Sequence, residues 1–163
     1  MAHLHENHYP ESMIDLHSID VWQQLTVIIN ASIAAFLGSL IGWERDRAGK
    51  SAGPRTMALV GSASAAIVTI GAIIDDASQN GDPARALHAI ITGIGFLGAG
   101  LIFTDKHSTG IQGVTTAATV FSTAAVGVAV GLGFQIAGGG LTVIILIILR
   151  STHVIERSIY RST

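Results

Sequence analysis

The sequence contains no cysteine, and only 12% of its 163 residues are charged. The missing thiols exclude disulfides, thiolate metal sites and cysteine nucleophiles. Because soluble domains carry about 25% charged residues, a chain this poor in charge cannot cover a surface that faces water. The sequence also has no nucleotide-binding loop, nucleophile elbow or metalloprotease motif. These absences predict a membrane protein that is not an enzyme, with no cofactor, no metal site and no nucleic-acid partner.

Apolar and small residues take the place of the missing charge, since 49% of the residues are apolar and 19 are glycine. Glycine costs about 1 kcal/mol relative to alanine in a helix in water, whereas in a membrane it lets helix backbones approach closely. A helix needs about 20 apolar residues to cross a bilayer. Five segments approach that length: Leu25–Trp43, Thr56–Ile74, Ala86–Phe103, Val114–Val130 and Phe134–Leu149. We therefore predict an all-α fold, an integral membrane bundle of five transmembrane helices, with a turn at Gly131–Gly133.

The basic residues are distributed unevenly around these segments. Eight of the nine lie in the loop after the first segment, the loop after the third and the C-terminal tail, and the ninth is Arg85. Five crossings place those three stretches on one side, and an excess of Lys and Arg marks the cytoplasmic side. We expect an extracytoplasmic, histidine-rich segment over residues 1–24, a membrane domain over 25–150 and a cytoplasmic tail over 151–163. The first of these has neither the basic start nor the apolar core of a signal peptide.

The sequence partly repeats itself at an offset of 60 residues, with 11 identities when residues 36–71 are aligned with 96–131. Phe36–Gly38 falls on Phe96–Gly98, and Thr56 falls on Thr116. We predict two helical hairpins related by an axis along the membrane normal, followed by a fifth helix. The alternative is a chance similarity of composition between two hairpins of the same shape.

Several motifs in order resemble the MgtC/SapB family of bacterial inner-membrane proteins. They are GSLIGWERDRAGKSAGPRTMALV from Gly38, DPAR at Asp82–Arg85, GIGFLGAGLIF from Gly93, and GVTTAAT from Gly113, followed by AAVG at Ala124–Gly127. The chain departs from the family pattern at Ala89, where the family has Gln, and at Val120-Phe121, where it has Trp. It also ends about a dozen residues after the last span, as a short member without the soluble C-terminal domain of longer ones would.

The resemblance implies a multi-pass protein of the bacterial inner membrane, linked to magnesium homeostasis and to virulence. It further implies a membrane partner such as the rotary ATP synthase. Separately, we expect a homo-oligomer in the lipid bilayer, with a dimer favoured. Two functions follow as hypotheses. One is a non-enzymatic regulator of magnesium homeostasis and membrane energetics. The other is a small cation transporter or channel, with a path between the repeats.

Polar residues at the predicted cytoplasmic boundary form the main candidate site. Glu44 and Arg55 bracket the first loop, and the repeat brings the start of the fourth span beside them. We predict a functional polar cluster made of Glu44, Asp46, Arg55, Thr115 and Thr116. A buried Glu44 needs a donor, and carboxylates at this boundary would also guide a hydrated cation. Arg45 and Arg47 are expected to be solvated anchors of the topology.

Two further sets of residues are singled out. On the outer side, Asp82 is expected to cap the third helix ahead of Pro83, with Arg85 one turn later. The glycines of the third span, Gly93, Gly95, Gly98 and Gly100, are expected to form the closest helix contact of the molecule, between hairpins or between protomers. Within the spans, the amide of Asn30 needs a hydrogen-bonding partner.

Overall fold

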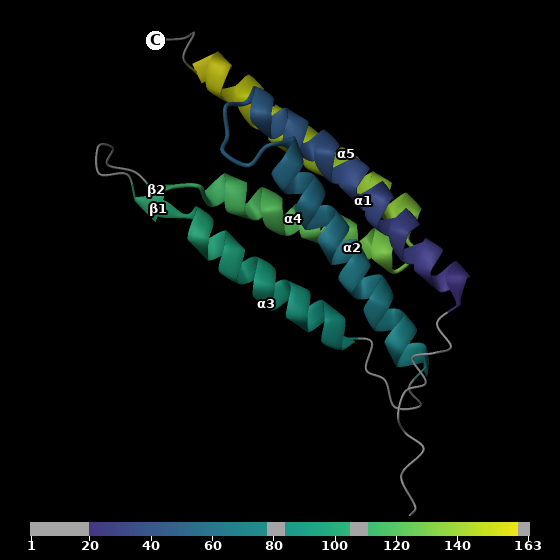
Figure 1. Ribbon diagram of the computed structural model, residues 1–163. Coiled ribbons are helices and arrows are strands. Elements are labelled where there is room, and N and C mark those ends of the chain that lie inside the picture. The colour runs from purple at the N-terminus through teal and green to yellow at the C-terminus, as the bar shows by residue number, and fades with distance from the viewer. Residues whose placement is uncertain (1–19, 78–83, 105–110, 160–163) are drawn as a thin grey trace, which may run out of the picture.

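The computed structural model describes residues 20–77, 84–104 and 111–159, with side chains described up to Ser151. The described residues form five helices: α1 Val21–Arg47, α2 Pro54–Ala77, α3 Ala84–Leu101, α4 Val114–Gly131 and α5 Gln135–Ile159. Figure 1 shows them packed side by side as one bundle. The first four are long and apolar enough to cross a membrane, and the apolar part of α5 is the shorter stretch Gln135–Ser151. The predicted all-α membrane bundle is confirmed.

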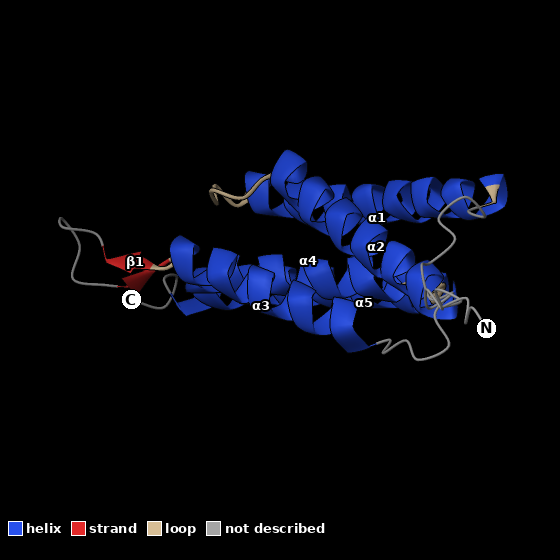
Figure 2. Cartoon of the chain, turned by 60° about the horizontal axis from the view of Figure 1, so that its bottom comes forward, coloured by secondary structure: helices blue, strands red, loops and turns tan. Residues whose placement is uncertain are grey.

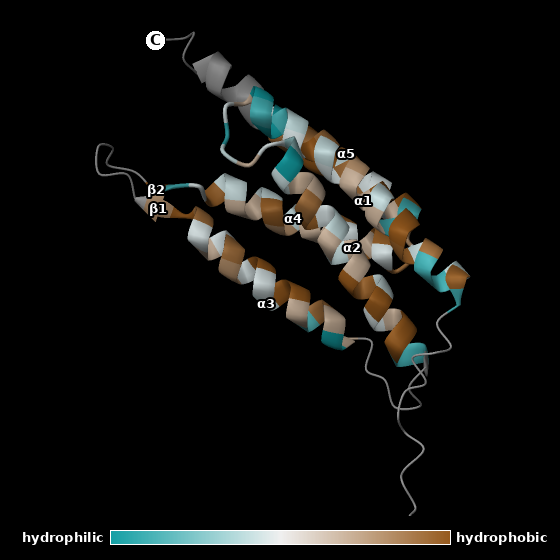
Figure 3. Ribbon diagram, viewed as in Figure 1, coloured by the Kyte–Doolittle hydropathy of each residue, from teal (hydrophilic) through white to brown (hydrophobic). Residues whose placement is uncertain are grey.

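The hydropathy of the chain follows this bundle. Figure 3 shows hydrophobic and small residues along the middle of the helices and hydrophilic residues gathered toward their ends. Large side chains such as Phe36, Ile136 and Ile147 are more than half exposed. A water-soluble protein buries such residues, whereas lipid tails solvate them.

Helix ends follow local sequence signals. At the start of α1, the backbone N–H of Asp20 donates to the Gln23 side chain at 3.1 Å. The predicted turn between the last two helices is present, with Gly133 at φ 86°. The left-handed conformation favours glycine, and here it lets the N–H of Gly133 bond to the carbonyl of Val130 at 2.9 Å.

The core of the bundle is built around α4. Its residues Val120, Val126 and Val130 are almost fully buried, and each belongs to a cluster with residues from other helices. Val130 packs with Ala34 of α1 and Ala65 of α2, and Val126 packs with Ile41 of α1 and Leu149 of α5. The fourth helix therefore packs against both helices of the first hairpin and against α5.

Small residues set the closest approaches between helices. A Cβ atom added at Gly38 of α1 would collide with the backbone carbonyl of Met57 in α2. One added at Gly61 of α2 would lie 2.7 Å from the carbonyl oxygen of Ala34, and one at Gly127 of α4 would collide with the carbonyl of Gly61. At these crossings only the absence of a side chain allows backbone to meet backbone.

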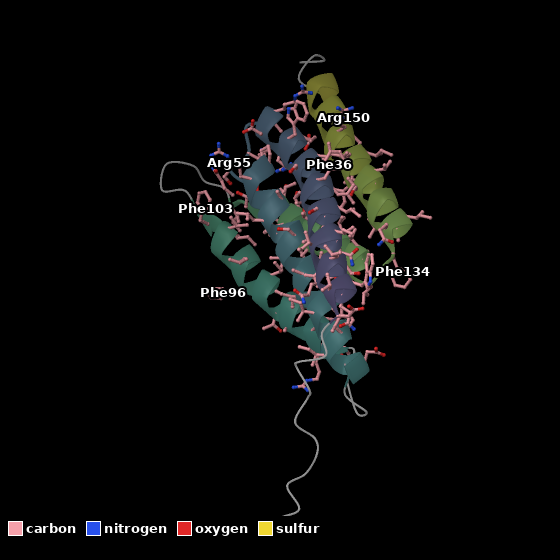
Figure 4. All side chains as sticks on the ribbon, turned by 45° about the vertical axis from the view of Figure 1, so that its right-hand side comes forward. Phe36, Arg55, Phe96, Phe103, Phe134 and Arg150 are labelled. Carbon is pink, nitrogen blue, oxygen red and sulfur yellow. The ribbon has the colours of Figure 1, made fainter. Side chains whose placement is uncertain are left out.

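The expectation that the glycines of α3 form the closest contact is wrong within the chain. A Cβ atom added at Gly93, Gly95 or Gly100 would meet nothing within 4 Å, and one at Gly98 would meet only the Cβ of Ala117 at 3.8 Å. Ile90 is the buried residue of α3. Figure 4 shows Phe96, which is 80% exposed, on the outer side of this helix. The side of α3 that carries Gly93 and Gly100 therefore remains open within the chain.

A short antiparallel ribbon follows α3, which the sequence did not predict. Phe103 pairs with Gln112 and Thr104 with Ile111, so β1 (Phe103–Thr104) and β2 (Ile111–Gln112) replace the last turn expected for the third span. Figure 2 shows the ribbon extending past the helix ends. Gly113 then opens α4 with φ 87°, where an added Cβ would collide with the carbonyl of Leu101. Glycine is therefore required at this turn.

Candidate functional site

Five of the six basic residues whose side chains the structure describes gather at one end of the bundle, which we call the basic end: Arg45, Arg47, Lys50, Arg55 and Arg150. Figure 1 shows that the loop after α1, the ribbon and the C-terminal end of α5 all lie at this end. Figure 4 shows Arg55 and Arg150 on opposite sides of it. The predicted polar cluster of Glu44, Asp46, Arg55, Thr115 and Thr116 lies at the basic end, but its members do not all lie together.

Arg45 is the charged residue that the bundle buries, which corrects the expectation that it is solvated. It is 3% exposed, and its Nε and Nη2 atoms have no hydrogen-bond partner. The cause is helical spacing, because Arg45 lies one turn after Ile41 and two turns after Gly38, and both are buried. This spacing in the sequence could have predicted that Arg45 is buried. The prediction of a solvated Arg45 relied instead on its position beside a charged loop.

Arg45 lines a cavity of about 560 Å³, which we call the Arg45 cavity. The loop after α1 contributes Lys50 and Ser51, and the start of α4 contributes Thr115 and Thr116. Thr116 is 4% exposed, whereas Thr115 is exposed. The structure thus brings the ends of the two loops together, as the repeat suggested, with Arg45 in the place expected for Glu44.

Glu44 faces a different part of the basic end. It lines a second cavity of about 470 Å³ with Trp43, Arg47 and Arg150, between α1 and α5. The Arg47 guanidinium lies over the Trp43 ring, 4.9 Å from its centroid, at a distance typical of a cation–π contact. Consecutive helical residues point about 100° apart, so only one of residues 44 and 45 can face α4.

The structure gives no support for the predicted pair of Glu44 and Arg55, which stays a prediction. Arg55 is exposed on the first turn of α2 and does not line the cavity beside Trp43 that Glu44 lines. Asp46 is exposed too, and its carboxylate lies against Gly53, where an added Cβ would be 3.6 Å from the Oδ1 atom. At the opposite end, Arg85 is exposed at the start of α3, and Asp82 lies outside the described residues.

A buried polar network lies toward the other end of the bundle. The Asn30 amide donates to Thr69 Oγ1 at 3.2 Å, and the Thr69 hydroxyl donates to the carbonyl of Gly131 at 2.9 Å. Gln135 donates to Asn30 Oδ1 at 3.3 Å. The sequence predicted that Asn30 has a partner, which is confirmed, but it could not show that four helices share one network. Each of these polar groups is satisfied inside the protein, as a membrane interior requires.

Neither region resembles a metal centre. Among the described residues, no three His, Asp or Glu side chains are grouped to hold an ion. The hydroxyls of Thr119 and Thr123 are used within α4, where they donate to the carbonyls of Thr115 and Thr119. The described lining of the Arg45 cavity offers hydrogen-bond donors and positive charge, with no carboxylate.

Comparison with known proteins identifies the family. A model of the MgtC family matches residues 32–158. The chain is 41% identical over 114 residues to Protein MgtC of Brucella abortus (strain 2308), which covers 69% of this chain and 46% of that protein. It is 37% identical over 131 residues to the putative magnesium transporter YhiD of Escherichia coli (strain K12), covering 77% and 60% respectively. No solved structure matches the chain.

The chain spans about half the length of the curated relatives that it matches. A third relative, an uncharacterized protein of Haemophilus influenzae, is 35% identical over 146 residues and covers 85% of this chain. The family model begins at Ser32 within α1 and ends at Ser158 in the last turn of α5, so it includes the second half of α1 and nearly all of the other four helices. From the motifs, the helical bundle and these matches together, we conclude that the chain belongs to the MgtC family.

Proposed function

We propose that the chain is a non-enzymatic regulator in the bacterial inner membrane, linked to magnesium homeostasis and membrane energetics. Its family and the names of its relatives, MgtC and the putative magnesium transporter YhiD, support a magnesium-related membrane protein. We further propose that it acts by binding another membrane protein rather than by moving an ion.

The open side of α3 that carries Gly93 and Gly100, which we call the α3 face, is the observation behind this proposal. Gly93 and Gly100 lie seven residues apart, and so on one side of the helix, and neither has a neighbour within 4 Å of an added Cβ, although Gly38 and Gly127 elsewhere in the bundle are used for backbone contact. In a membrane, helices associate through close packing of small residues. The α3 face therefore has the surface chemistry of a helix-binding site, and we propose a second copy of the chain or a partner such as the ATP synthase as its occupant.

Charge at the basic end supports the regulator over a cation path. Arg45 and Lys50 both line the Arg45 cavity. Their two positive charges would repel a divalent cation that enters this cavity. The transporter remains the second candidate because a relative is named a putative magnesium transporter and because polar Thr116, Thr119 and Thr123 form a buried row on α4.

Flux measurement separates the two functions. The purified protein, sealed in vesicles with a magnesium-sensitive dye, is expected to give the same magnesium entry as empty vesicles. Magnesium entry that depends on the protein would overturn the regulator proposal and favour the transporter.

A substitution on the α3 face tests the proposed mechanism. Gly93→Leu should abolish the support that the protein gives to growth at low magnesium, while changing the free energy of unfolding by no more than about 1 kcal/mol, the difference in helix propensity. Gly140→Leu is the matched control, because Gly140 is also exposed with no neighbour within 4 Å, but lies on α5. Equal activity of the two variants in cells would show that the α3 face has no role.

The orientation is also a proposal, which places the basic end in the cytoplasm. Because the native sequence has no cysteine, single cysteines give unambiguous labels. A cysteine replacing Lys50 should be shielded from an impermeant thiol reagent in intact cells, and one replacing Leu132, between α4 and α5, should react. The reverse pattern would contradict the proposed orientation.

A further inference from the structure

We propose that the Arg45 cavity binds a phosphate group, carried by a phospholipid headgroup or by inorganic phosphate in solution. The proposal concerns a binding site and does not depend on whether the protein is a regulator or a transporter. It rests on a buried guanidinium with two nitrogen atoms that lack a hydrogen-bond partner, a helix N-terminus that opens onto the same cavity, and the charge of the remaining lining.

The first observation is the state of the Arg45 guanidinium. The residue is 3% exposed, and two of its nitrogen atoms, Nε and Nη2, are buried with no hydrogen-bond partner. A buried charge is normally paired and hydrogen-bonded, because leaving it unpaired is strongly destabilising. Arg45 nevertheless lines an open cavity of about 560 Å³. A guanidinium presents a planar set of donors that matches the oxygen atoms of a phosphate.

The second observation is the N-terminus of α4, whose first residues Val114, Thr115 and Thr116 line the same cavity. This helix is 18 residues long, and its N-cap residue is Gly113, so no side chain caps it. The first N–H groups of a helix have no partner within the helix, and together with the helix dipole they favour an anion. A residue with a side chain cannot replace Gly113 at the N-cap without a shift of the backbone, because its Cβ would collide with the carbonyl of Leu101.

The third observation is the chemistry of the remaining lining. Lys50 adds a second positive charge, and Ser51 and Thr115 bring hydroxyl groups that can donate to an oxyanion. The described lining contains no carboxylate, since Glu44 lines the separate cavity beside Trp43. A divalent cation would be repelled by this lining, whereas a phosphate would meet donors from α1, the following loop and α4.

Two binding measurements test the proposal and distinguish the sources of phosphate. In the first, the full chain in nanodiscs of phosphatidylcholine is titrated with inorganic phosphate, with chloride at equal ionic strength as the reference. In the second, phosphatidylglycerol is introduced into the nanodiscs, and lipid that stays bound is counted by native mass spectrometry. Binding in the first arm assigns soluble phosphate, and retained phosphatidylglycerol in the second assigns a lipid headgroup. Binding in neither arm overturns the proposal.

Variants localise the binding to the cavity. Arg45→Gln should weaken the binding seen in either arm at least about tenfold, because charge-assisted hydrogen bonds are lost. Arg55→Ala is the matched control, since Arg55 is an exposed arginine at the same end that does not line the cavity, and it should bind like the wild type. Binding by Arg45→Gln that equals the wild type would overturn the proposal.

A second pair of variants keeps the test decisive if Arg45→Gln does not fold. Lys50 and Thr115 are both exposed, so Lys50→Ala and Thr115→Val should leave the fold intact. Each should weaken binding several-fold by removing one donor from the cavity. Unchanged binding in both variants would place the phosphate elsewhere and overturn the proposal.

Discussion

The two hairpins of the bundle, α1–α2 and α3–α4, are similar in sequence but pack very differently. In the first, Gly38 approaches Met57 so closely that a Cβ atom would collide with the Met57 carbonyl. In the second, the equivalent Gly98 faces Ala117, the equivalent of Met57, with 3.8 Å between an added Cβ and the alanine side chain. The same pair of positions meets in both hairpins, but only the first brings backbone against backbone.

Two larger side chains account for the difference. Ala34 and Gly61 cross closely in the first hairpin, and the offset of 60 residues replaces them with Ile94 and Phe121 in the second. Ile94 and Phe121 both line a cavity of about 180 Å³ between α3 and α4. Bulky residues at a crossing hold helices apart, whereas small ones allow contact. Two positions can therefore decide whether a membrane hairpin closes on itself or leaves a face for another helix.

A second pair of equivalent contacts lies at the loop ends. A Cβ added at Gly42 would lie 2.6 Å from the carbonyl oxygen of Gly53, and one added at Gly113 would lie 3.3 Å from the Cα of Ile102. Gly42 and Gly53 align with Ile102 and Gly113 at the same offset. These shared contacts are consistent with duplication, but the rotation axis between the hairpins stays a prediction.

The largest effect is expected for alanine at the equivalent glycines. Gly38→Ala should destabilise the protein by about 1–3 kcal/mol, because the added methyl group overpacks the contact with Met57. Gly98→Ala should leave stability unchanged or raise it by less than about 1 kcal/mol, since alanine favours the helix. Thermal unfolding in detergent measures both. Equal losses for the two variants would refute the packing difference between the hairpins.

An intermediate effect is expected from the polar network, which ties α1, α2, α4 and α5 together and omits α3. Asn30→Ala should cost about 1–2 kcal/mol, because it removes two hydrogen bonds between helices in an apolar interior. Ser32→Ala is the control, since Ser32 bonds only to the Ile28 carbonyl of its own helix, at 2.7 Å. If both variants unfolded at the wild-type temperature, the network would contribute nothing to the assembly of these helices.

The smallest effect concerns the loop of the first hairpin. Because Arg55 is exposed and does not line the cavity that Glu44 lines, Glu44→Ala and Arg55→Ala should be additive within about 0.5 kcal/mol in a double-mutant cycle. The cycle is measured by chemical or thermal unfolding of the two single variants and the double variant. A coupling energy well above that limit would restore the pair that the sequence suggested.

Much of the fold could be predicted because each helix that crosses a membrane requires a long apolar segment. The lengths of these segments predicted the five helices, and the glycines between the last two predicted the turn at Gly133. Which helix packs closely could not be predicted. Glycine permits a close helix contact, but the sequence does not show whether another helix of the same chain makes it. Gly95 on α3 and Gly127 on α4 look alike in sequence, and only Gly127 meets a neighbouring backbone.

The candidate site was predicted less well. The sequence located the right end of the molecule and the contribution of Thr115 and Thr116, but it assigned the buried charge to Glu44 and Arg55 instead of Arg45. Two adjacent charged residues at a helix end differ only by a rotation of about 100°. Choosing between them requires the whole buried face to be followed from Gly38 through Ile41 to Arg45.

The buried network of Asn30 also bears on how the protein is made. The partners of the network are separated along the chain by 39 residues for Asn30 and Thr69, 62 for Thr69 and Gly131, and 105 for Asn30 and Gln135. At a synthesis rate of about 5–20 residues per second, Thr69 is made seconds before its acceptor on α4, and the Asn30 oxygen must await α5. Nascent α1 and α2 can pair early, but they retain unsatisfied polar atoms until the last helix enters the membrane. The network is therefore complete only when α5 has been made. If translation stops before Gln135, the Asn30 oxygen lacks its donor from α5.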